Sequence, residues 1–330
     1  MLKVKDLNVE FNAKEKIIHA VRGIDFTLFK GETLAIVGES GSGKSVTSRT
    51  IMGLLGYNAR VSGEILLEGE NLLKLNEAQM CKIRGKRIAM VFQDPFSSLD
   101  PIMKVGKQLT EAMDAGVLDK GQRRELALKL MREVGIPEPE KRIDQYPFEL
   151  SGGMRQRIVI AIALASNPDI LICDEPTTAL DVTIQAQILE LIEGLKKQRR
   201  LSVIFITHDL GVVAKVADRI AVMYAGKIVE VGTVNEIFYE SRHPYTWALL
   251  SCAPRLDESK KLKSIEGTAP DLSKEIIGDA FAPRNEYALN IDFVAEPPEY
   301  KLSETHSVYS WLMHEDAPRV EPPERINRAT

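Results

Sequence analysis

Residues 38–45 read Gly-Glu-Ser-Gly-Ser-Gly-Lys-Ser and fit the phosphate-binding pattern G-x-x-x-x-G-K-[S/T]. The apolar run 34–37 before the motif is typical of a β-strand, and residues 46–55 after it predict a helix. Glycines let the backbone curl closely around a phosphate, so that N–H groups point inward and the helix N-terminus adds its dipole. The motif therefore predicts a phosphate-binding loop rather than a glycine-rich turn that only caps a helix.

Seven positions of this loop are candidate nucleotide-binding residues. We expect the Lys44 ammonium to reach the β- and γ-phosphates, and the Ser45 hydroxyl to ligate Mg²⁺. The remaining candidates are the glycines and serines of the loop, namely Gly38, Ser40, Gly41, Ser42 and Gly43.

A second motif, Ile170-Leu171-Ile172-Cys173-Asp174-Glu175, is an apolar run that ends in two acids. Such a run suits a central parallel strand, and ligands of open α/β sheets bind at the carboxyl ends of the strands. We expect Asp174 to hold Mg²⁺, directly or through water, and Glu175 to polarise the attacking water. Taken alone, the motif is also compatible with a strand followed by an acidic helix cap.

The stretch 150–157, Leu-Ser-Gly-Gly-Met-Arg-Gln-Arg, resembles the LSGGQ signature of the ATP-binding-cassette (ABC) family, with Met154 at the fifth position. Ser151 is a favourable helix cap, and the glycines allow the helix N-terminus to approach an anion. The resemblance implies that Ser151 and Gly153 bind the γ-phosphate of ATP held by an opposite subunit. A single subunit would then be a poor ATPase.

Three more residues occupy positions that the ABC resemblance makes functional. Gln93 matches the glutamine that touches Mg²⁺ and senses the membrane partner, and Asp181, in Ala179-Leu180-Asp181, matches the loop at the dimer interface. His208, after the apolar run 203–206, matches the switch histidine that contacts the γ-phosphate. Together with Lys44 and Glu175, Gln93 and His208 complete the predicted catalytic set.

The ABC resemblance also implies an aromatic residue that stacks on adenine. Phe11 matches this position, and His19 is a possible substitute. The alternative for Phe11 is a strand residue that packs into the core.

Composition limits the other possibilities. The net charge of −4 over 330 residues implies no bulk attraction to nucleic acid. No apolar run approaches the roughly 18–20 residues of a membrane span, and residues 1–6 lack the apolar core of a signal peptide. The three cysteines show no C-x-x-C spacing, which favours a reducing compartment. We therefore expect a cytosolic protein that reaches the membrane through a partner.

The pattern along the chain predicts an α/β fold. Strand character in 2–37 and 60–92 is followed by a largely helical stretch, 95–165, and then by βα alternation in 166–232, which implies a parallel sheet. The resemblance implies a P-loop ABC cassette with a RecA-like core, an antiparallel β subdomain and a helical subdomain. The expected domains are 1–252 for the cassette and 253–330 for a C-terminal extension.

Three stretches narrow the resemblance to the oligopeptide and dipeptide importer ATPases. They are Ser98-Leu99-Asp100-Pro101, the variant signature 151–157, and Arg242-His243-Pro244-Tyr245-Thr246. The resemblance continues into the tail through 267–270 and Phe281-Ala282-Pro283-Arg284. The closest type is the first of the two oligopeptide-permease ATPases of Gram-positive bacteria.

The tail departs from this family at three positions. Asp279, Asn285 and Ser310 stand where many members carry cysteines that are proposed to bind an iron–sulfur cluster. Carboxylate, amide and hydroxyl oxygens are poor substitutes for thiolates on iron, so we expect no cluster.

The resemblance implies an ATP- and Mg²⁺-dependent ATPase that drives oligopeptide import. Its partners would be a second, different ATPase subunit, two permease subunits and, indirectly, an extracellular peptide-binding protein. The stretch Phe92 to Pro101 would dock a permease helix at the cytoplasmic face of the membrane, unless it is a plain surface loop. A dipeptide, nickel, glutathione or a sugar remains an alternative cargo. A ribosome- or DNA-associated ABC ATPase is less compatible with a chain that has one cassette. A non-catalytic regulator is less compatible with a chain that retains Glu175 and His208.

Overall fold

The computed structural model describes residues 1–13, 16–113, 119–178, 180–252 and 265–323. Two compact units make up the chain: unit 1 contains 1–28, 33–74 and 206–330, and unit 2 contains 29–32 and 75–205. Strand β8 (Ser202–Thr207) contributes residues to both. Residues 253–264, where the expected domain boundary lies, are outside the described residues.

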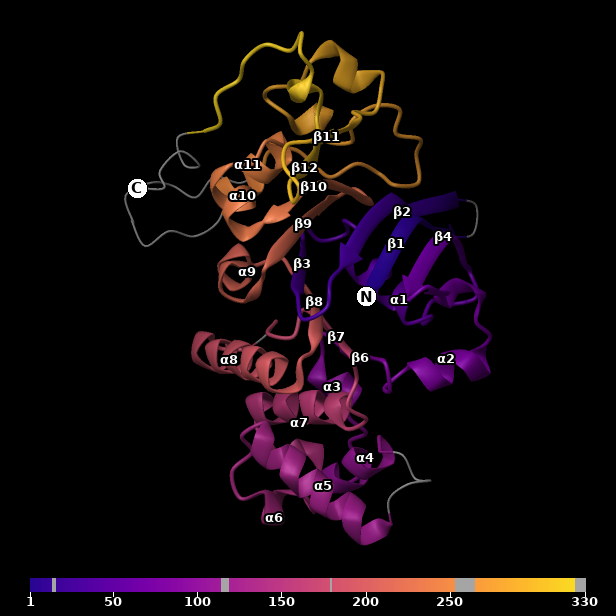
Figure 1. The fold of residues 1–330 in the computed structure, drawn as a ribbon, viewed down its shortest axis with the longest axis vertical. Helices are drawn as coiled ribbons and strands as arrows, with labels where there is room; N and C mark the ends of the chain where they lie inside the picture. The colour runs from indigo at the N-terminus through magenta and orange to yellow at the C-terminus, as the bar shows by residue number, and fades with distance from the viewer. Residues whose placement is uncertain (14–15, 114–118, 179, 253–264, 324–330) are drawn as a thin grey trace. The chain divides into compact units, whose positions relative to one another are not determined.

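Unit 1 contains a four-stranded antiparallel sheet in the order β2-β1-β4-β5 (Figure 1). Its strands are β1 (Leu2–Ala13), β2 (Lys16–Leu28), β4 (Ala59–Leu67) and β5 (Glu70–Asn71), and a 3₁₀ turn, η1 (Leu72–Lys74), follows. In β1, apolar residues alternate with polar ones within Leu2–Val4 and again within Leu7–Val9, and these four residues are buried. A register shift between Val4 and Leu7 keeps both pairs on the buried face. This sheet confirms the predicted antiparallel β subdomain.

The strands of a second sheet that lie within unit 1 follow the order β11-β12-β10-β9-β3. They are β3 (Thr33–Val37), β9 (Arg219–Tyr224), β10 (Lys227–Thr233), β11 (Glu299–Lys301) and β12 (Ser307–Tyr309). Strand β3 is fully buried and pairs in parallel with β9. The βα alternation predicted for 166–232 does not extend to β9 and β10, which follow each other directly and pair antiparallel. The reason is the two-residue turn Ala225–Gly226, in which both φ angles are positive (44° and 81°), as a tight hairpin requires.

Helices of unit 1 follow these strands. They are α1 (Lys44–Ile51), α9 (Leu210–Val216), α10 (Val234–Tyr239) and α11 (Pro244–Ser251). Helix α1 is shorter than the predicted 46–55. Gly53 takes a φ of 61°, which ends the helix in the left-handed conformation that glycine tolerates.

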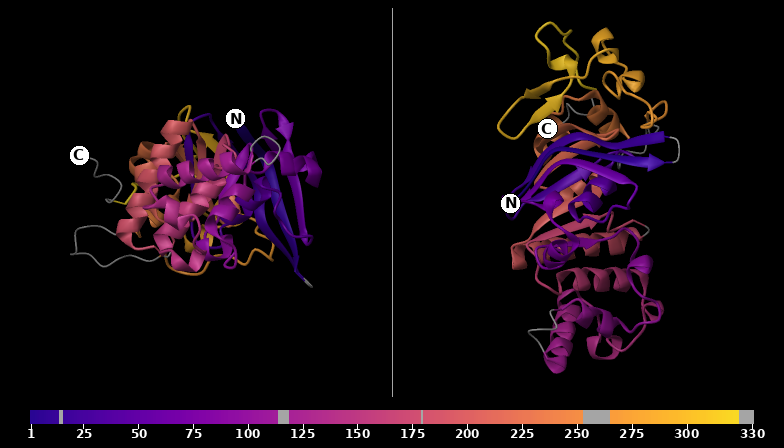
Figure 2. Two further views of the ribbon diagram at one scale, coloured as in Figure 1. Left: turned by 90° about the horizontal axis from the view of Figure 1, so that it is seen from below. Right: turned by 90° about the vertical axis from the view of Figure 1, so that its right-hand side faces the viewer.

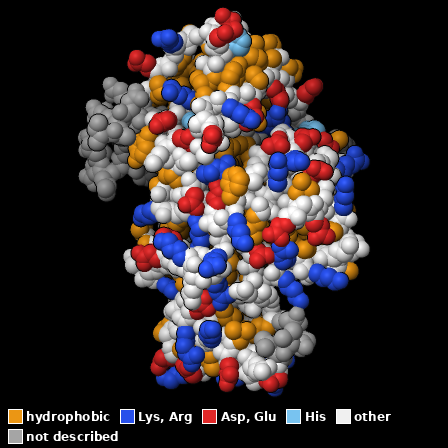
Figure 3. Space-filling view, viewed as in Figure 1, with side chains coloured by type: hydrophobic (Ala, Val, Ile, Leu, Met, Phe, Trp, Pro, Cys, Tyr) orange, Lys and Arg blue, Asp and Glu red, His pale blue; other side chains and the backbone are white. Residues whose placement is uncertain are grey.

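The C-terminal extension continues the second sheet. Its strand β12 pairs antiparallel with β10, with Glu230 opposite Val308, and β11 pairs with β12 (Figure 2). Short 3₁₀ turns connect its loops: η3 (Ala282–Arg284), η4 (Asn290–Phe293) and η5 (Trp311–Met313). Figure 3 shows hydrophobic side chains over this region, where Ile277, Phe293 and Val294 are exposed.

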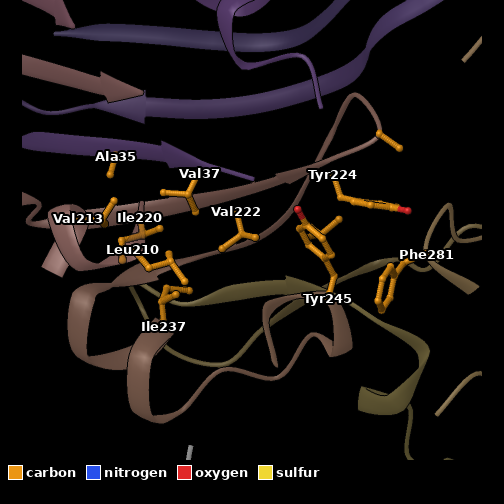
Figure 4. Close-up of a cluster of buried hydrophobic side chains, with 12 residues drawn as sticks. Ala35, Val37, Leu210, Val213, Ile220, Val222, Tyr224, Ile237, Tyr245 and Phe281 are labelled. Carbon is orange, nitrogen blue, oxygen red and sulfur yellow. The ribbon is translucent and has the colours of Figure 1, made fainter. Parts of the chain in front are cut away.

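A buried cluster joins the extension to the strands of unit 1. Tyr224 from β9, Tyr245 from α11 and Phe281 from the extension lie together at one end of it (Figure 4). Val37, Ile220 and Ile237 lie toward the other end, with Val222 between the two groups (Figure 4). The extension therefore contributes to the core of unit 1.

Unit 2 combines two parallel strands with a largely helical stretch, as predicted for 95–165. The strands are β6 (Ile88–Val91) and β7 (Ile170–Asp174), and both are fully buried. The helices are α2 (Glu77–Ile83), α3 (Pro95–Ser98), α4 (Val105–Glu111), α5 (Lys120–Glu133), α6 (Pro139–Arg142), α7 (Gly152–Leu164) and α8 (Val182–Arg199), with a 3₁₀ turn, η2 (Pro147–Glu149). Among the described residues, no helix has the length and apolar character that a bilayer span needs.

Candidate nucleotide-binding and hydrolysis site

The predicted phosphate loop connects β3 to α1 and approaches neighbouring backbone closely. A Cβ atom on Gly38 would lie 2.0 Å from the Met223 carbonyl oxygen, and one on Gly43 would lie 2.6 Å from that of Ala20. Gly43 also has a φ of 104°, which side chains rarely adopt. The loop can therefore take this path only with glycine at these two positions. Of the remaining candidates, Ser42 is buried, whereas Ser40 and Gly41 are exposed.

Lys44 is held across the loop by its carbonyl groups. Its Nζ donates to the Gly38 oxygen at 2.9 Å and to the Glu39 oxygen at 2.8 Å, and the residue is only 5% exposed. Ser45 follows in the first turn of α1. The donors of this site are the buried Lys44 ammonium and the backbone N–H groups of the glycine-rich loop and the helix N-terminus. Such donors suit the phosphates of a nucleotide.

Gln93, Asp174 and Glu175 belong to unit 2, and the structure brings two of them into contact. The Gln93 amide donates to Glu175 Oε2 at 3.0 Å, and the Thr178 hydroxyl donates to the same oxygen at 2.9 Å. Asp174 ends β7 and is 2% exposed. The sequence reasoning missed Thr178, although a threonine three residues after an acid is a usual partner in such a turn.

Glu175 has a φ of 49°, in the left-handed region. A side chain other than glycine adopts this conformation at a cost of about 1–3 kcal/mol, and such strain is concentrated at functional sites. The bond from the Thr178 backbone N–H to the Glu175 carbonyl oxygen, at 3.2 Å, helps to hold the turn.

Ser151 and Asp181 are helix caps in unit 2. Ser151 Oγ accepts the Met154 N–H at 3.3 Å and starts α7, and Asp181 Oδ1 accepts the Ile184 N–H at 2.9 Å and starts α8. Gly153 lies against α8, because a Cβ there would come within 2.8 Å of the Ile184 side chain. Ala179, named with Asp181 in the predicted interface loop, lies outside the described residues.

His208 and Phe11 belong to unit 1. His208 is exposed between β8 and α9, and the next residue, Asp209, caps α9 by accepting the Gly211 N–H at 2.8 Å. Phe11 is half-buried on β1, opposite Ile18 on β2. The alternative, His19, lies 3.1 Å from Glu10 in an ion pair when it is protonated.

The three tail positions that lack cysteine make local hydrogen bonds instead. Asp279 accepts the Phe281 N–H at 2.9 Å, and Asn285 accepts the Tyr287 N–H at 2.9 Å. Ser310 accepts the Leu312 N–H at 3.4 Å. Each side chain therefore stabilises a turn two residues ahead.

Comparison with known proteins places this site in a family. The ABC transporter model matches residues 21–178, and the model of the oligopeptide/dipeptide transporter C-terminal region matches 229–291. The oligopeptide transport ATP-binding protein OppD of Bacillus subtilis is 60% identical over 333 residues, which are 99% of this chain and 92% of that protein. The chain belongs to the oligopeptide/dipeptide ABC transporter ATPases.

Other ABC transporter proteins are also similar to most of this chain. The oligopeptide transport ATP-binding protein AmiE of Streptococcus pneumoniae (strain TIGR4) is 54% identical over 98% of this chain and 92% of that protein. The dipeptide transport ATP-binding protein DppD of Bacillus subtilis is 51% identical over 96% of each. A dimeric bacterial ABC transporter cassette has a TM-score of 0.64 at 29% identity, over 71% of this chain and 99% of that one. The predicted ABC cassette fold is confirmed, and this ABC ATPase has a part beyond the cassette.

Proposed function

We propose that this ABC ATPase drives the import of oligopeptides through a membrane permease. The observation that supports this cargo most directly is the similarity to an oligopeptide transport protein over 99% of the chain, which includes the extension. We also propose that residues 1–252 act as the ATP-binding domain and 253–330 as an extension specific to this transporter type.

The chemistry of the proposed reaction is in-line attack of water on the γ-phosphate of ATP. Mg²⁺, held by Ser45, Gln93 and Asp174, would neutralise charge on the phosphates. Lys44 binds the β- and γ-phosphates, and Glu175 orients and polarises the water with His208. The bonds from Gln93 and Thr178 to Glu175 Oε2 support this role, because they fix the carboxylate before the nucleotide binds.

We propose that the working form is a pair of different ATPase subunits on two permease subunits, with an external peptide-binding protein. Ser151, Gly153 and Asp181 then face the nucleotide of the partner ATPase, and Phe11 stacks on adenine. The positions of Ser151 and Asp181 at helix N-termini support contact with an anion. The pair would sit at the cytoplasmic face of the membrane, without nucleic acid and without an iron–sulfur cluster.

The stretch 92–101 has the properties of a docking surface for a permease helix. Asp94 caps α3 by accepting the Phe96 N–H at 2.9 Å, and this bond lowers the pKa of the Asp94 carboxyl. Phe96 is 61% exposed, and the Arg155 guanidinium lies 3.8 Å from the centre of its ring. An exposed aromatic ring on a fixed turn suits a partner surface, and Arg155 links it to the signature helix α7.

The test is ATPase activity of the assembled transporter in proteoliposomes, with binding protein loaded with an oligopeptide, a dipeptide, glutathione or nickel. Stimulation by the oligopeptide, absent in the Glu175→Gln variant, supports the proposal. Stimulation by dipeptides alone would favour the second candidate, dipeptide import, which the similarity to a dipeptide transport protein supports. An ATPase rate that none of these cargoes changes would overturn the importer function.

A further inference from the structure

The phosphate loop carries a carboxylate, Glu39, directly after Gly38. Arg284 of the extension binds this carboxylate with both ends of its guanidinium group: Nη1 lies 2.7 Å from Oε2, and Nη2 lies 3.0 Å from Oε1. The Arg284 side chain is 6% exposed and that of Glu39 is 28% exposed. A residue more than 240 positions away therefore bonds directly to the loop that is built to hold phosphates.

Arg284 is fixed by further bonds within unit 1. Its Nε donates to the Glu266 carbonyl oxygen at 2.9 Å, Nη2 to that of Ile265 at 3.3 Å, and Nη1 to the Tyr224 hydroxyl at 3.1 Å. The hydrogen bond to Glu39 raises the pKa of Arg284 above its ordinary value, so the guanidinium stays charged. A bidentate pair with this many supports is directional as well as strong.

The backbone of Glu39 is held by the same region. Its N–H donates to the Tyr245 hydroxyl at 2.8 Å, and burial raises the pKa of this phenol, so that it remains neutral. Tyr245 is fully buried between Tyr224 and Phe281, with ring centres 4.4 and 5.3 Å away (Figure 4). The stretch 242–246, which narrowed the resemblance, and the stretch 281–284, through which it continues into the tail, thus both contact Glu39 and each other.

The charge of Glu39 explains why this contact matters. A carboxylate within a phosphate-binding loop repels the anionic phosphates, and the repulsion is large where water is partly excluded. Arg284 neutralises it while holding the loop in place. We propose that Arg284 is a positioning residue for ATP, through which the C-terminal extension sets the affinity of the phosphate loop. This inference rests on the ATP-binding function of the site and is independent of the transported cargo.

The test is a double-mutant cycle on the full chain, with ATP affinity measured by calorimetry in the presence of Mg²⁺. Arg284→Gln leaves the Glu39 charge unpaired, and we expect about tenfold weaker binding, within the range of coupling between contacting charged residues. Glu39→Gln removes the repulsive charge, and we expect affinity within about twofold of the unmodified chain. Adding Glu39→Gln to Arg284→Gln should restore most of the lost affinity.

Thermal unfolding without nucleotide separates this role from a purely structural one. Arg284 also bonds to Ile265, Glu266 and Tyr224, so the double variant should unfold as early as Arg284→Gln although its ATP affinity recovers. Arg284→Lys keeps the charge without the bidentate geometry and should fold and retain intermediate affinity. The matched control is Glu296→Gln, which removes two other ion pairs of the extension, with Arg22 at 3.0 Å and with Lys227, and should leave ATP affinity unchanged.

Two results would overturn the inference. One is unchanged ATP affinity in Arg284→Gln, and the other is a double variant that binds as weakly as Arg284→Gln. If the unmodified chain itself does not bind ATP, the proposed function fails instead, so the two failures are distinguishable.

Discussion

At the scale of single residues, Glu175 combines a strained backbone with a constrained side chain. Its φ of 49° places the backbone in a conformation that costs free energy. The Gln93 amide and the Thr178 hydroxyl both donate to one oxygen of its carboxylate. Such an arrangement fixes the direction of the carboxylate, which a group that orients a water molecule needs.

Glu175→Gln should therefore block hydrolysis while nucleotide binding persists. The amide has nearly the same shape but lacks the charge that polarises water, and we expect at least a hundredfold loss in kcat. Single-turnover ATP hydrolysis by the assembled complex measures this loss, with ATP affinity as the control. A near-normal turnover would show that another group activates the water.

Lys44→Ala should weaken ATP binding by about tenfold or more, because it removes the buried ammonium that spans the loop. Equilibrium binding of ATP to the full chain tests this expectation. The matched control is Lys30→Ala, an exposed lysine before β3, which should bind ATP normally. If Lys44→Ala binds ATP as tightly as the unmodified chain, Lys44 does not contribute to the site.

At the scale of secondary structure elements, the contact between β10 and β12 depends on a buried acid. Glu230 is fully buried; its Oε1 accepts the Arg242 N–H at 2.6 Å and lies 2.9 Å from His306 Nε2. Its Oε2 accepts the His243 N–H at 3.2 Å. One side chain thus connects β10, the start of α11 and the extension.

Glu230→Ala should destabilise the chain by about 3–5 kcal/mol, because buried donors lose their acceptor. Thermal unfolding, with hydrogen exchange of the β12 amides, measures the effect. Glu240→Ala, at an exposed glutamate nearby, is the control and should change stability by less than about 0.5 kcal/mol. Unchanged exchange in β12 would mean that Glu230 does not hold the extension.

Most elements of this fold could be predicted from local sequence. The phosphate loop, the helical stretch 95–165 and the acid at the end of β7 each follow from a short pattern of apolar residues and glycines. The antiparallel turn at Ala225–Gly226 could not be predicted from local sequence, because alanine rarely adopts a positive φ. Nor could the Arg284–Glu39 pair be predicted, since nothing local to either residue specifies a partner so distant in the sequence.

At the scale of the whole molecule, stability should depend on pH through Asp279 of the extension. Burial raises the pKa of its carboxyl from an ordinary 3.8 to about 6. Below about pH 4 the group is protonated in both the folded and unfolded chain, and above about pH 6 it is ionised in both. Ionisation of Asp279 therefore lowers the free energy of unfolding progressively as the pH rises from 4 to 6, and the full loss of stability remains at neutral pH.

Asp279→Asn should remove this cost while keeping an acceptor for the Phe281 N–H. We expect a stabilisation of up to about 3 kcal/mol at pH 8, which disappears toward pH 4. Unfolding midpoints at a series of pH values test it, against Glu304→Gln, an exposed acid in the same extension. A gain that persists unchanged at pH 4 would assign the effect to something other than ionisation.

The pairing of β12 with β10 has a consequence for the behaviour of fragments of this protein. Strand β10 is buried along five successive residues, and within unit 1 its neighbours are β9 and β12. A chain cut before β12 would present β10 as an edge with unpaired backbone groups, which other copies could extend into intermolecular sheets. The strand that ends the sheet, β11, has only three residues, and two of them, Glu299 and Lys301, are charged. Short, charged edges of this kind discourage pairing with a second copy, so we expect a chain cut before β12 to aggregate more readily than the full chain.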